Sequence, residues 1–278
     1  MILDPKQIDK VVLNALEEDM PYGDVTTDNL ISLEDRSKAR FIAKAEGVLA
    51  GMTVMKRVFE LIDADVSVEI YYEDGSKVKK GDIVAHVEGR TGSILKGERT
   101  ALNLLQHLSG VASRTNNFAE LVKDYPVSVV DTRKTLPGLR YLEKYAVRCG
   151  GGRNHRFSLS DAVMLKDNHI VAAGGIGPAV AKVRAAIPHT TKIEVETETL
   201  EMVQQALDAK ADIIMLDNMS NEEMSEAVKL VAGRALTEAS GNVTEERIVE
   251  IAKTGVDIIS IGCITHSVPA MDISLRFY

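Results

Sequence analysis

Charged and polar residues follow six short apolar runs in the second half of the chain. The runs cover residues 127–130, 162–165, 193–195, 213–216, 234–236 and 256–261. The polar groups at or just after their ends are Asp131, Thr132, Arg133, Lys134, Lys166, Asp167, Asn168, Glu194, Glu196, Asp217, Asn218, Glu238 and Ser260. If the runs are parallel strands, their carboxyl ends meet at one mouth of a β/α barrel, whereas an open sheet gathers its ligands at one switch point. Polar groups after all six runs favour the barrel.

The charges in this region suit a substrate that carries phosphate. The fixed positive charges are Arg133, Lys134, Arg156 and Lys166, with His155 as a further candidate. Carboxylates come from Glu196 and Asp217. Two glycine-containing loops follow the last runs, where barrels often bind phosphate through backbone N–H groups. These loops contain Ser240, Gly241 and Asn242, and Ile261, Gly262 and Cys263. Together the groups predict a polyanionic phosphate substrate accompanied by Mg²⁺.

The distribution of charge supports a local anionic ligand. The formal net charge of the chain is −8, which argues against a nucleic-acid-binding protein. Between Asp131 and Ile170, however, eight Lys and Arg face four Asp and Glu, a balance of +4. The rest of the chain therefore sums to −12. A cationic segment in an acidic chain indicates a site for an anion.

The apolar spacing predicts the elements that must hold these residues. Residues 1–64 read as helices, with a break at 21–27, a strand at 39–45 and a helix at 53–62. Residues 65–90 alternate like strands, and a long helix is expected at 97–123. Beyond residue 127, apolar runs alternate with helices expected at 199–210, 220–231 and 244–255. Units of one strand and one helix, recurring at roughly 21 residues, predict a parallel sheet.

Other chemistries find little support. The sequence lacks the Gly-x-Ser-x-Gly, His-Glu-x-x-His and Walker A motifs. Residues 65–90 resemble the hairpins of lipoyl and biotinyl carrier domains, but no modifiable lysine stands at an evident hairpin tip, so this stretch is interpreted as structural. Only Cys149 and Cys263 occur, without metal-type spacing. With no signal-type segment and no run of membrane-spanning length, a cytoplasmic location is expected.

Several motifs, in order along nearly the whole chain, resemble quinolinate phosphoribosyltransferases. They are Gly23-Asp-Val-Thr-Thr27, Gly97-Glu-Arg-Thr-Ala-Leu-Asn103, Thr132-Arg-Lys-Thr-Leu-Pro-Gly-Leu-Arg140, Glu143-Lys-Tyr-Ala-Val-Arg148, Gly150-Gly-Gly-Arg-Asn-His-Arg156, Leu165-Lys-Asp-Asn-His169, Glu194-Val-Glu196, Leu216-Asp-Asn218, Glu238-Ala-Ser-Gly-Asn242 and Gly262-Cys-Ile-Thr-His-Ser267. Two positions depart from the family pattern: Ser158, where Gly is more frequent, and Cys263, where Ala is usual. Neither change removes a charged group.

The resemblance implies a fold and an assembly. An N-terminal α/β sandwich, expected over residues 1–113 and joined by 269–278, leads into an α/β barrel of about seven strands over 114–268. Members of the family form homodimers, and some form hexamers. The N-terminal domain of one subunit covers the barrel mouth of another, so that Arg99 would reach a neighbour's site.

The resemblance also implies a reaction and a set of site residues. Quinolinate and phosphoribosyl pyrophosphate would give nicotinate mononucleotide, pyrophosphate and CO₂, with Mg²⁺ as the cofactor. Lys134, Glu196 and Asp217 are expected to be catalytic, and the last two are candidate Mg²⁺ ligands besides the substrate itself. The expected substrate-binding residues are Arg99, Thr132, Arg133, Lys134, His155, Arg156, Lys166, Glu196, Asp217, Ser240, Gly241, Asn242, Ile261, Gly262, Cys263 and His266.

Three alternatives stay open at this point. A nicotinate phosphoribosyltransferase shares the fold but binds a monocarboxylate, and the number of cations here favours a dicarboxylate. A molybdenum-associated homologue of the family is a second candidate, and its substrate does not follow from the residues. A non-catalytic paralogue would bind quinolinate or a nucleotide without turnover, although the intact charged residues speak against it.

Overall fold

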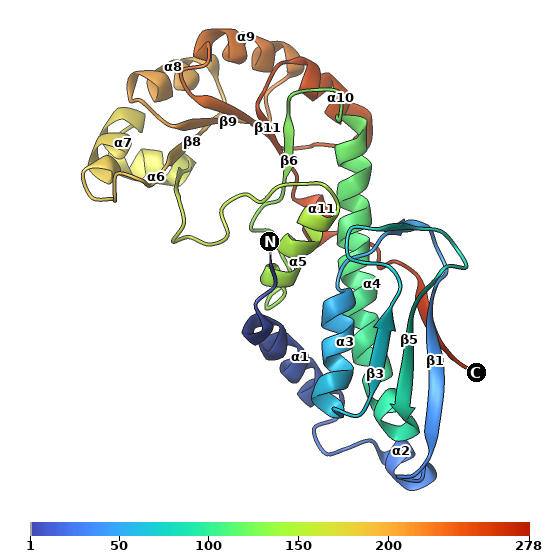
Figure 1. Cartoon of the computed structure of the whole chain (residues 1–278). Coiled ribbons are helices and arrows are strands. Elements are labelled where there is room, and N and C mark those ends of the chain that lie inside the picture. Colours follow the sequence, from blue (N-terminus) through green and yellow to red (C-terminus); the bar gives the residue numbers. More distant parts are fainter. Residues whose placement is uncertain (1) are drawn as a thin grey trace. The chain divides into compact units, whose positions relative to one another are not determined.

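The computed structural model describes residues 2–278 and contains two compact units (Figure 1). We call the first the antiparallel-sheet unit; it comprises the chain up to Asn116, Thr135–Gly151 and Cys263–Tyr278. The second, the parallel-sheet unit, comprises Asn117–Lys134 and Gly152–Gly262. Compactness does not test whether either unit folds by itself, so the domain limits expected from the sequence stay a prediction.

A four-stranded antiparallel sheet forms the centre of the first unit. Its strands, in spatial order, are β12 (Ile273–Phe277), β1 (Arg36–Ala43), β5 (Ile83–Arg90) and β3 (Ser67–Ile70). Alternate residues of β1 are buried: Ala39, Phe41 and Ala43. Phe41 meets Phe59 edge to face, with ring centroids 6.1 Å apart, which packs the sheet against α3 (Met52–Ile62). A small pair, β2 (Gly47–Val48) and β4 (Lys77–Val78), completes the strands of this unit.

The antiparallel-sheet unit contains further helices besides α3. The remaining helices are α1 (Pro5–Asp19), α2 (Val25–Leu30), α4 (Thr91–Leu121), which continues into the other unit, α5 (Arg140–Cys149) and α11 (Cys263–His266). Asp4 caps α1, whose first residue is proline, and Ile8, Val12 and Leu16 form its buried stripe. The predicted long helix is confirmed, although α4 begins six residues before position 97.

Six parallel strands form the sheet of the second unit. Their spatial order is β6 (Ser128–Val130), β11 (Ile258–Ser260), β10 (Leu236–Ser240), β9 (Ile213–Asp217), β8 (Ile193–Thr197) and β7 (Val163–Leu165). An isolated parallel bridge between Val130 and Arg153 extends the sheet beyond β6. The predicted parallel α/β architecture is therefore confirmed.

One predicted strand was placed too early. The predicted run at 234–236 overlaps β10 only at Leu236, where the strand begins. Ala232 and Gly233 are left-handed, with φ of 49° and 73°, and end the preceding helix. Arg234 then turns back, because its Nη2 donates to Leu230 O at 2.6 Å and its Nε to Val231 O at 3.2 Å. Residues 232–234 therefore end the preceding helix and are not part of a strand.

Helices follow the strands of the parallel sheet as the sequence predicts. They are α6 (Asp167–Ala173), α7 (Ile176–Arg184), α8 (Leu200–Asp208), α9 (Asn221–Val231) and α10 (Glu245–Lys253). At the start of α9, Glu223 N–H donates to Ser220 Oγ at 3.2 Å and Ser220 N–H donates to Glu223 Oε2 at 2.8 Å. This reciprocal pair is a capping box. In Figure 1 these helices line one side of the sheet.

The two faces of the parallel sheet differ in polarity. Helices α7 and α8 pack on β8, whose Ile193 and Val195 are fully buried. The intervening residues of β8, Glu194 and Glu196, point to the other face. Because Glu196 pairs in register with Met215, and Met215 with Glu238, the acids of neighbouring strands lie on that same face. The interior face is thus polar, unlike the branched apolar layers that usually fill a barrel.

No helix within residues 2–278 combines the length and the apolar character that crossing a membrane requires.

Candidate active site

The predicted site residues fall into both units. Most belong to the parallel-sheet unit: Thr132, Arg133, Lys134, His155, Arg156, Lys166, Glu196, Asp217, Ser240, Gly241, Asn242, Ile261 and Gly262. Arg99, Cys263 and His266 belong to the antiparallel-sheet unit. Arg99 is exposed on α4, and His266 at the end of α11 shares a hydrogen bond of 2.6 Å with Ser267 Oγ.

The carboxyl ends of β7, β8 and β9 bring predicted residues together. Lys166 directly follows β7, and its Nζ lies 2.6 Å from Glu196 Oε2. Asp217 ends β9 on the same face, two residues beyond Met215, the partner of Glu196. One oxygen of Glu196 is therefore occupied by a lysine, while Asp217 stands at the end of the neighbouring strand.

Asn218 connects the ends of β9 and β10. Its backbone is left-handed, with φ of 57°, and its N–H donates to Ser240 O at 3.0 Å. Its amide Nδ2 donates to Asp217 Oδ2 at 2.8 Å, and its Oδ1 accepts from Asn242 Nδ2 at 3.1 Å. A side chain at Gly241 would overlap Asn218 Oδ1, so this position requires glycine. Asn218 thus orients both Asp217 and the glycine-containing loop at 240–242. The sequence did not predict this role.

Asp131 fixes the segment that carries His155 and Arg156. It is fully buried at the end of β6. Its Oδ2 accepts from Asn154 Nδ2 at 2.6 Å, and its Oδ1 accepts the N–H of His155 at 2.9 Å. Nearby, the N–H of Lys134 donates to Thr132 Oγ1 at 3.0 Å. The two cationic segments after β6 are therefore anchored to the same strand end.

Arg156 and Arg133 place two guanidinium groups in one region. Arg156 Nη1 donates to Ala162 O at 2.9 Å, and its Nη2 lies 3.6 Å from Met164 Sδ, on β7. Burial and the positive charge of Arg133 hold the pKa of Arg156 below its usual value. Two neighbouring positive charges repel each other, and a bound anion would relieve this repulsion. The arrangement therefore indicates an anion-binding site.

His155 lies between two buried glutamates. Its Nε2 is 3.2 Å from Glu194 Oε2, on β8, and 3.4 Å from Glu238 Oε2, on β10. Glu194 and Glu238 are only 2% and 1% exposed. The second oxygen of each, Oε1, is buried without a hydrogen-bond partner among the described residues. A direct substrate contact through His155 stays a prediction.

The buried surroundings shift the pKa values of His155 and Glu194. Burial lowers the pKa of His155, but the hydrogen bonds and charges of Glu194 and Glu238 outweigh it and raise the pKa to about 10. Burial also raises the pKa of Glu194. The N–H of Arg156 donates to His155 Nδ1 at 2.7 Å, so the ring hydrogen belongs on Nε2. A hydrogen on Nε2 points at both glutamates.

Two groups of residues carry oxygen and nitrogen atoms that could bind a metal ion. His155, Glu194 and Glu238 bring three potential ligand atoms within 4.8 Å of one another. A metal on Nε2 needs Nδ1 to donate a hydrogen bond, whereas Nδ1 here accepts one, so this cluster fits a metal poorly. Glu196 and Asp217 offer hard carboxylate oxygens, which suit Mg²⁺.

Glu194 and Glu238 were recognised in the sequence as polar strand ends but were given no role. The signal that could have singled them out is their position within the strands rather than after them. An acid inside a buried strand must find a partner within the sheet.

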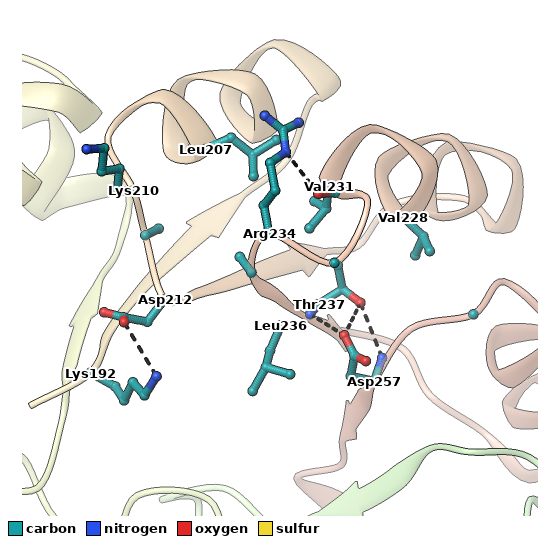
Figure 2. A pocket seen from close by; sticks show the side chains of 14 residues that line it. Lys192, Leu207, Lys210, Asp212, Val228, Val231, Arg234, Leu236, Thr237 and Asp257 are labelled. Carbon is teal, nitrogen blue, oxygen red and sulfur yellow. Dashed lines mark hydrogen bonds and ion pairs between the residues drawn. The ribbon is translucent and has the colours of Figure 1, made fainter.

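A cavity of about 750 Å³ lies at the opposite ends of the strands (Figure 2). Its lining includes Lys192, which precedes β8, Asp212, which precedes β9, and Leu236, the first residue of β10. Figure 2 shows its two acids paired: Asp212 with Lys192, at 3.5 Å, and Asp257 with Thr237, at 2.8 Å. None of the predicted site residues lines it. In β/α barrels this end serves stability rather than chemistry.

Two family models match consecutive parts of the chain. The model for the quinolinate phosphoribosyl transferase N-terminal domain matches residues 24–109, and the C-terminal domain model matches 111–276. The mitochondrial quinolinate phosphoribosyltransferase (decarboxylating) 2b of Nicotiana tabacum is 44% identical, covering 96% of this chain and 81% of its own length.

Solved structures agree with the family models. NadC from Streptococcus pyogenes is 45% identical, with a TM-score of 0.96, covering 100% of this chain and 99% of its own. The nicotinate-nucleotide pyrophosphorylase from Francisella tularensis is 39% identical, with a TM-score of 0.94, covering 100% and 98% of the two chains. An α/β chain with a polar-faced parallel sheet thus has close structural counterparts. The chain belongs to the quinolinate phosphoribosyltransferase family.

Proposed function

We propose that the chain transfers a phosphoribosyl group from phosphoribosyl pyrophosphate to quinolinate and removes one carboxyl group. The products are nicotinate mononucleotide, pyrophosphate and CO₂, a reaction of de novo NAD biosynthesis. Membership of the family supports the proposal. The observation that carries the proposal is the pair Arg133 and Arg156, whose two positive charges suit the two carboxylates of quinolinate.

The proposed division of labour follows from charge. Arg forks bind planar carboxylates through two parallel N–H bonds, so Arg133 and Arg156 are assigned to quinolinate, assisted by Lys134 and Lys166. The loops at 240–242 and 261–263 are assigned to phosphate. When pyrophosphate leaves C1 of the ribose, positive charge develops there, and Glu196 and Asp217 stabilise it or hold the ribose hydroxyl groups.

Decarboxylation needs no dedicated electron sink from the protein. Once the ring nitrogen carries ribose, the pyridinium accepts the electron pair that remains when the adjacent carboxylate leaves as CO₂. A proton then takes the place of the carboxyl group. The contribution of the chain is to position the two substrates and to exclude water around them.

The direct test is incubation of the purified protein with quinolinate, phosphoribosyl pyrophosphate and Mg²⁺. Nicotinate mononucleotide and CO₂ are expected in equal amounts. Nicotinate in place of quinolinate serves as the control for the alternative activity. Human nicotinic acid phosphoribosyltransferase, 12% identical with a TM-score of 0.63, shares only the fold, so the fold does not decide between the substrates. Folded protein that forms neither product would refute the proposal.

We propose Mg²⁺ as the cofactor, held mainly by the substrate's phosphates and by Glu196 and Asp217. When bound, the ion neutralises the charge of the leaving pyrophosphate. Glu196→Gln or Asp217→Asn is expected to slow turnover and shift the Mg²⁺ dependence while quinolinate still binds, because acids beside the dianion would repel it. Glu198→Gln, an exposed acid just beyond β8, is the matched control. Lost quinolinate binding with an unchanged Mg²⁺ response would place the two acids at the pyridine instead.

We also propose that active sites are shared within a homodimer, which can assemble further into hexamers. Arg99 is exposed on α4 and belongs to the antiparallel-sheet unit, so a neighbouring subunit can use it. Mixed Arg99→Ala and Lys134→Ala chains, each inactive alone, are expected to recover up to about a quarter of wild-type activity by random dimer formation. No recovery despite measured subunit exchange would assign both residues to the same chain's site, or Arg99 to none.

A cytoplasmic location is part of the proposal. Cys149 and Cys263 are both free thiols, as expected in a reducing compartment. Fractionation of cells that produce the protein, followed by detection in each fraction, tests the location.

A further inference from the structure

His155 is held from three directions, and each contact comes from a different part of the sheet. Asp131, at the end of β6, accepts the backbone N–H of His155 at 2.9 Å. Glu194 on β8 and Glu238 on β10 face its Nε2 at 3.2 and 3.4 Å. The strand order β6-β11-β10-β9-β8 makes these three strands alternate members of the sheet.

Alternate strands supply the side chains of one interior layer in a β/α barrel. Here that layer consists of two acids with the imidazole of His155 between them, in place of branched apolar side chains. Such a layer is costly, because Glu194 and Glu238 are almost fully buried and each leaves its Oε1 without a partner among residues 2–278. A purely structural layer would have been built from valine or leucine.

The remaining ring nitrogen of His155 connects this layer to Arg156. Nδ1 accepts the backbone N–H of Arg156 at 2.7 Å. The guanidinium of Arg156 is held separately, by Ala162 O and Met164 Sδ. The imidazole therefore fixes the backbone from which the guanidinium extends, and Asp131 fixes the preceding peptide.

We infer that His155, clamped between Glu194 and Glu238, is a positioning residue that sets the direction of Arg156 toward the substrate carboxylate. His155 acts through Arg156 rather than by touching the substrate, in contrast to the direct contact predicted from the sequence. The inference rests on the proposed function, in which Arg156 binds quinolinate. It extends that function by assigning roles to Glu194 and Glu238.

Glu194 contributes in a second way, together with Asp161. Arg133 repels the guanidinium of Arg156, whereas the carboxyl groups of Glu194 and Asp161 favour its positive charge. These two acids thus help both guanidinium groups to stand ready before the quinolinate dianion arrives. Preorganised cations bind without a reorganisation cost, which is the property that a second shell of residues provides.

Two substitutions of His155 separate its two hydrogen bonds. His155→Asn keeps an acceptor near the place of Nδ1 but loses the link to the glutamates. His155→Gln keeps a donor near the place of Nε2 but loses the acceptor for Arg156 N–H. Both variants are expected to raise KM for quinolinate about 10–100-fold, with KM for phosphoribosyl pyrophosphate changed less than about twofold.

Substitutions of Glu238 provide the conservative rescue. Glu238→Gln keeps a carbonyl oxygen for Nε2–H and is expected to stay within about threefold of the wild-type KM for quinolinate. Glu238→Met keeps the volume but removes the acceptor, and it is expected to behave like His155→Asn. Thr237→Val, one residue before Glu238, removes the hydrogen bond between Thr237 Oγ1 and Asp257 Oδ2. This control should lower the melting temperature without separating the two KM values.

Non-additivity gives the decisive measurement. In the Arg156→Ala background, His155→Gln is expected to change quinolinate binding, measured by calorimetry, by less than about twofold, because its target is already absent. An additive loss in the double variant would overturn the inference and assign His155 a contact of its own. If wild-type protein turns over quinolinate but the His155 and Glu238 variants bind it normally, only this inference fails. Wild-type protein that neither binds nor converts quinolinate would refute the proposed function and this inference with it.

Discussion

Asp63, in the antiparallel-sheet unit, and Glu194 and Glu238, in the parallel-sheet unit, are all buried acids, but their oxygens are treated differently. Arg90 binds both oxygens of Asp63, with Nε and Nη2 each at 2.6 Å, and Ser93 Oγ adds a bond of 2.7 Å. The two glutamates share a single imidazole and leave two oxygens unpartnered among the described residues.

The difference separates structure from function. An acid with a full set of donors gains from its burial, and its charge holds a fold together. A buried acid with an oxygen that accepts no hydrogen bond lowers the stability of the fold. Such an acid is expected where it serves a functional site. The parallel-sheet unit thus gives up stability at the place where its cations gather, while Asp63 in the antiparallel-sheet unit has donors for both of its oxygens and contributes to stability.

The largest effect is expected where the cations meet the substrate. Arg133→Ala or Arg156→Ala should weaken quinolinate binding about 10–150-fold, because a lost charge-assisted bond costs about 1.5–3 kcal/mol. The melting temperature should change little. Arg153→Ala, an exposed arginine of the same segment, is the control. Calorimetry measures the affinity for quinolinate, and thermal unfolding measures the melting temperature. An unchanged affinity with a lower melting temperature would show that the two arginines have a structural role instead.

Removing the charge of Asp63 should affect stability but not catalysis. Asp63→Asn is expected to lower the free energy of unfolding by about 2–3 kcal/mol, since it breaks a bidentate pair with Arg90. The hydrogen bond from Arg90 holds the pKa of Asp63 well below its usual value. The contribution is therefore complete above the unfolded pKa, about 3.9, and disappears as the pH falls below it.

Urea unfolding of wild-type and variant protein between pH 7 and pH 3 measures this effect. The difference between the two should be constant above about pH 5 and shrink at lower pH. Asp65→Asn is the matched control, because Asp65 is exposed and lies 4.0 Å from Arg90 Nη2. A difference that grows on acidification would contradict the assignment.

The smallest effect on stability is expected at Glu238. Glu238→Gln should leave the free energy of unfolding within about 1 kcal/mol of wild type, or raise it, because the variant removes a buried acid that is only partly satisfied. Glu250→Gln on the surface gives the baseline. A loss of more than about 2 kcal/mol would show that Glu238 serves stability as Asp63 does.

Much of the fold could be predicted because its signals are local. The capping box at Ser220, the strand runs and the order of strand and helix are written in neighbouring residues. The start of β10 could not be predicted, because Arg234 belongs to the predicted run but its side chain binds the carbonyl groups at the end of α9. Its role depends on a helix end that the apolar pattern does not reveal.

The site was only partly predictable for a related reason. The charged residues after the strands were visible in the sequence, but their partners depend on which strands are neighbours. The contacts of His155 with Glu194 and Glu238 join residues far apart in sequence, and so does the pairing of Asp63 with Arg90. Asn218 was identified as a polar strand end and as part of a motif, but its bonds to Ser240 and Asn242 could not be predicted, because they need a left-handed backbone at Asn218.

The pairing of β1 with β12 has a consequence for synthesis. Ala39 of β1 lies opposite Phe277 of β12, so β1 lacks this neighbour until the ribosome has made β12. At about 5–20 residues per second, one edge of β1 waits roughly 10–50 s. An unpaired edge is a template for aggregation, and charged side chains discourage it. Arg36, Lys38 and Arg40 place three cations along this strand. These cations therefore protect that edge of the nascent chain until β12 covers it.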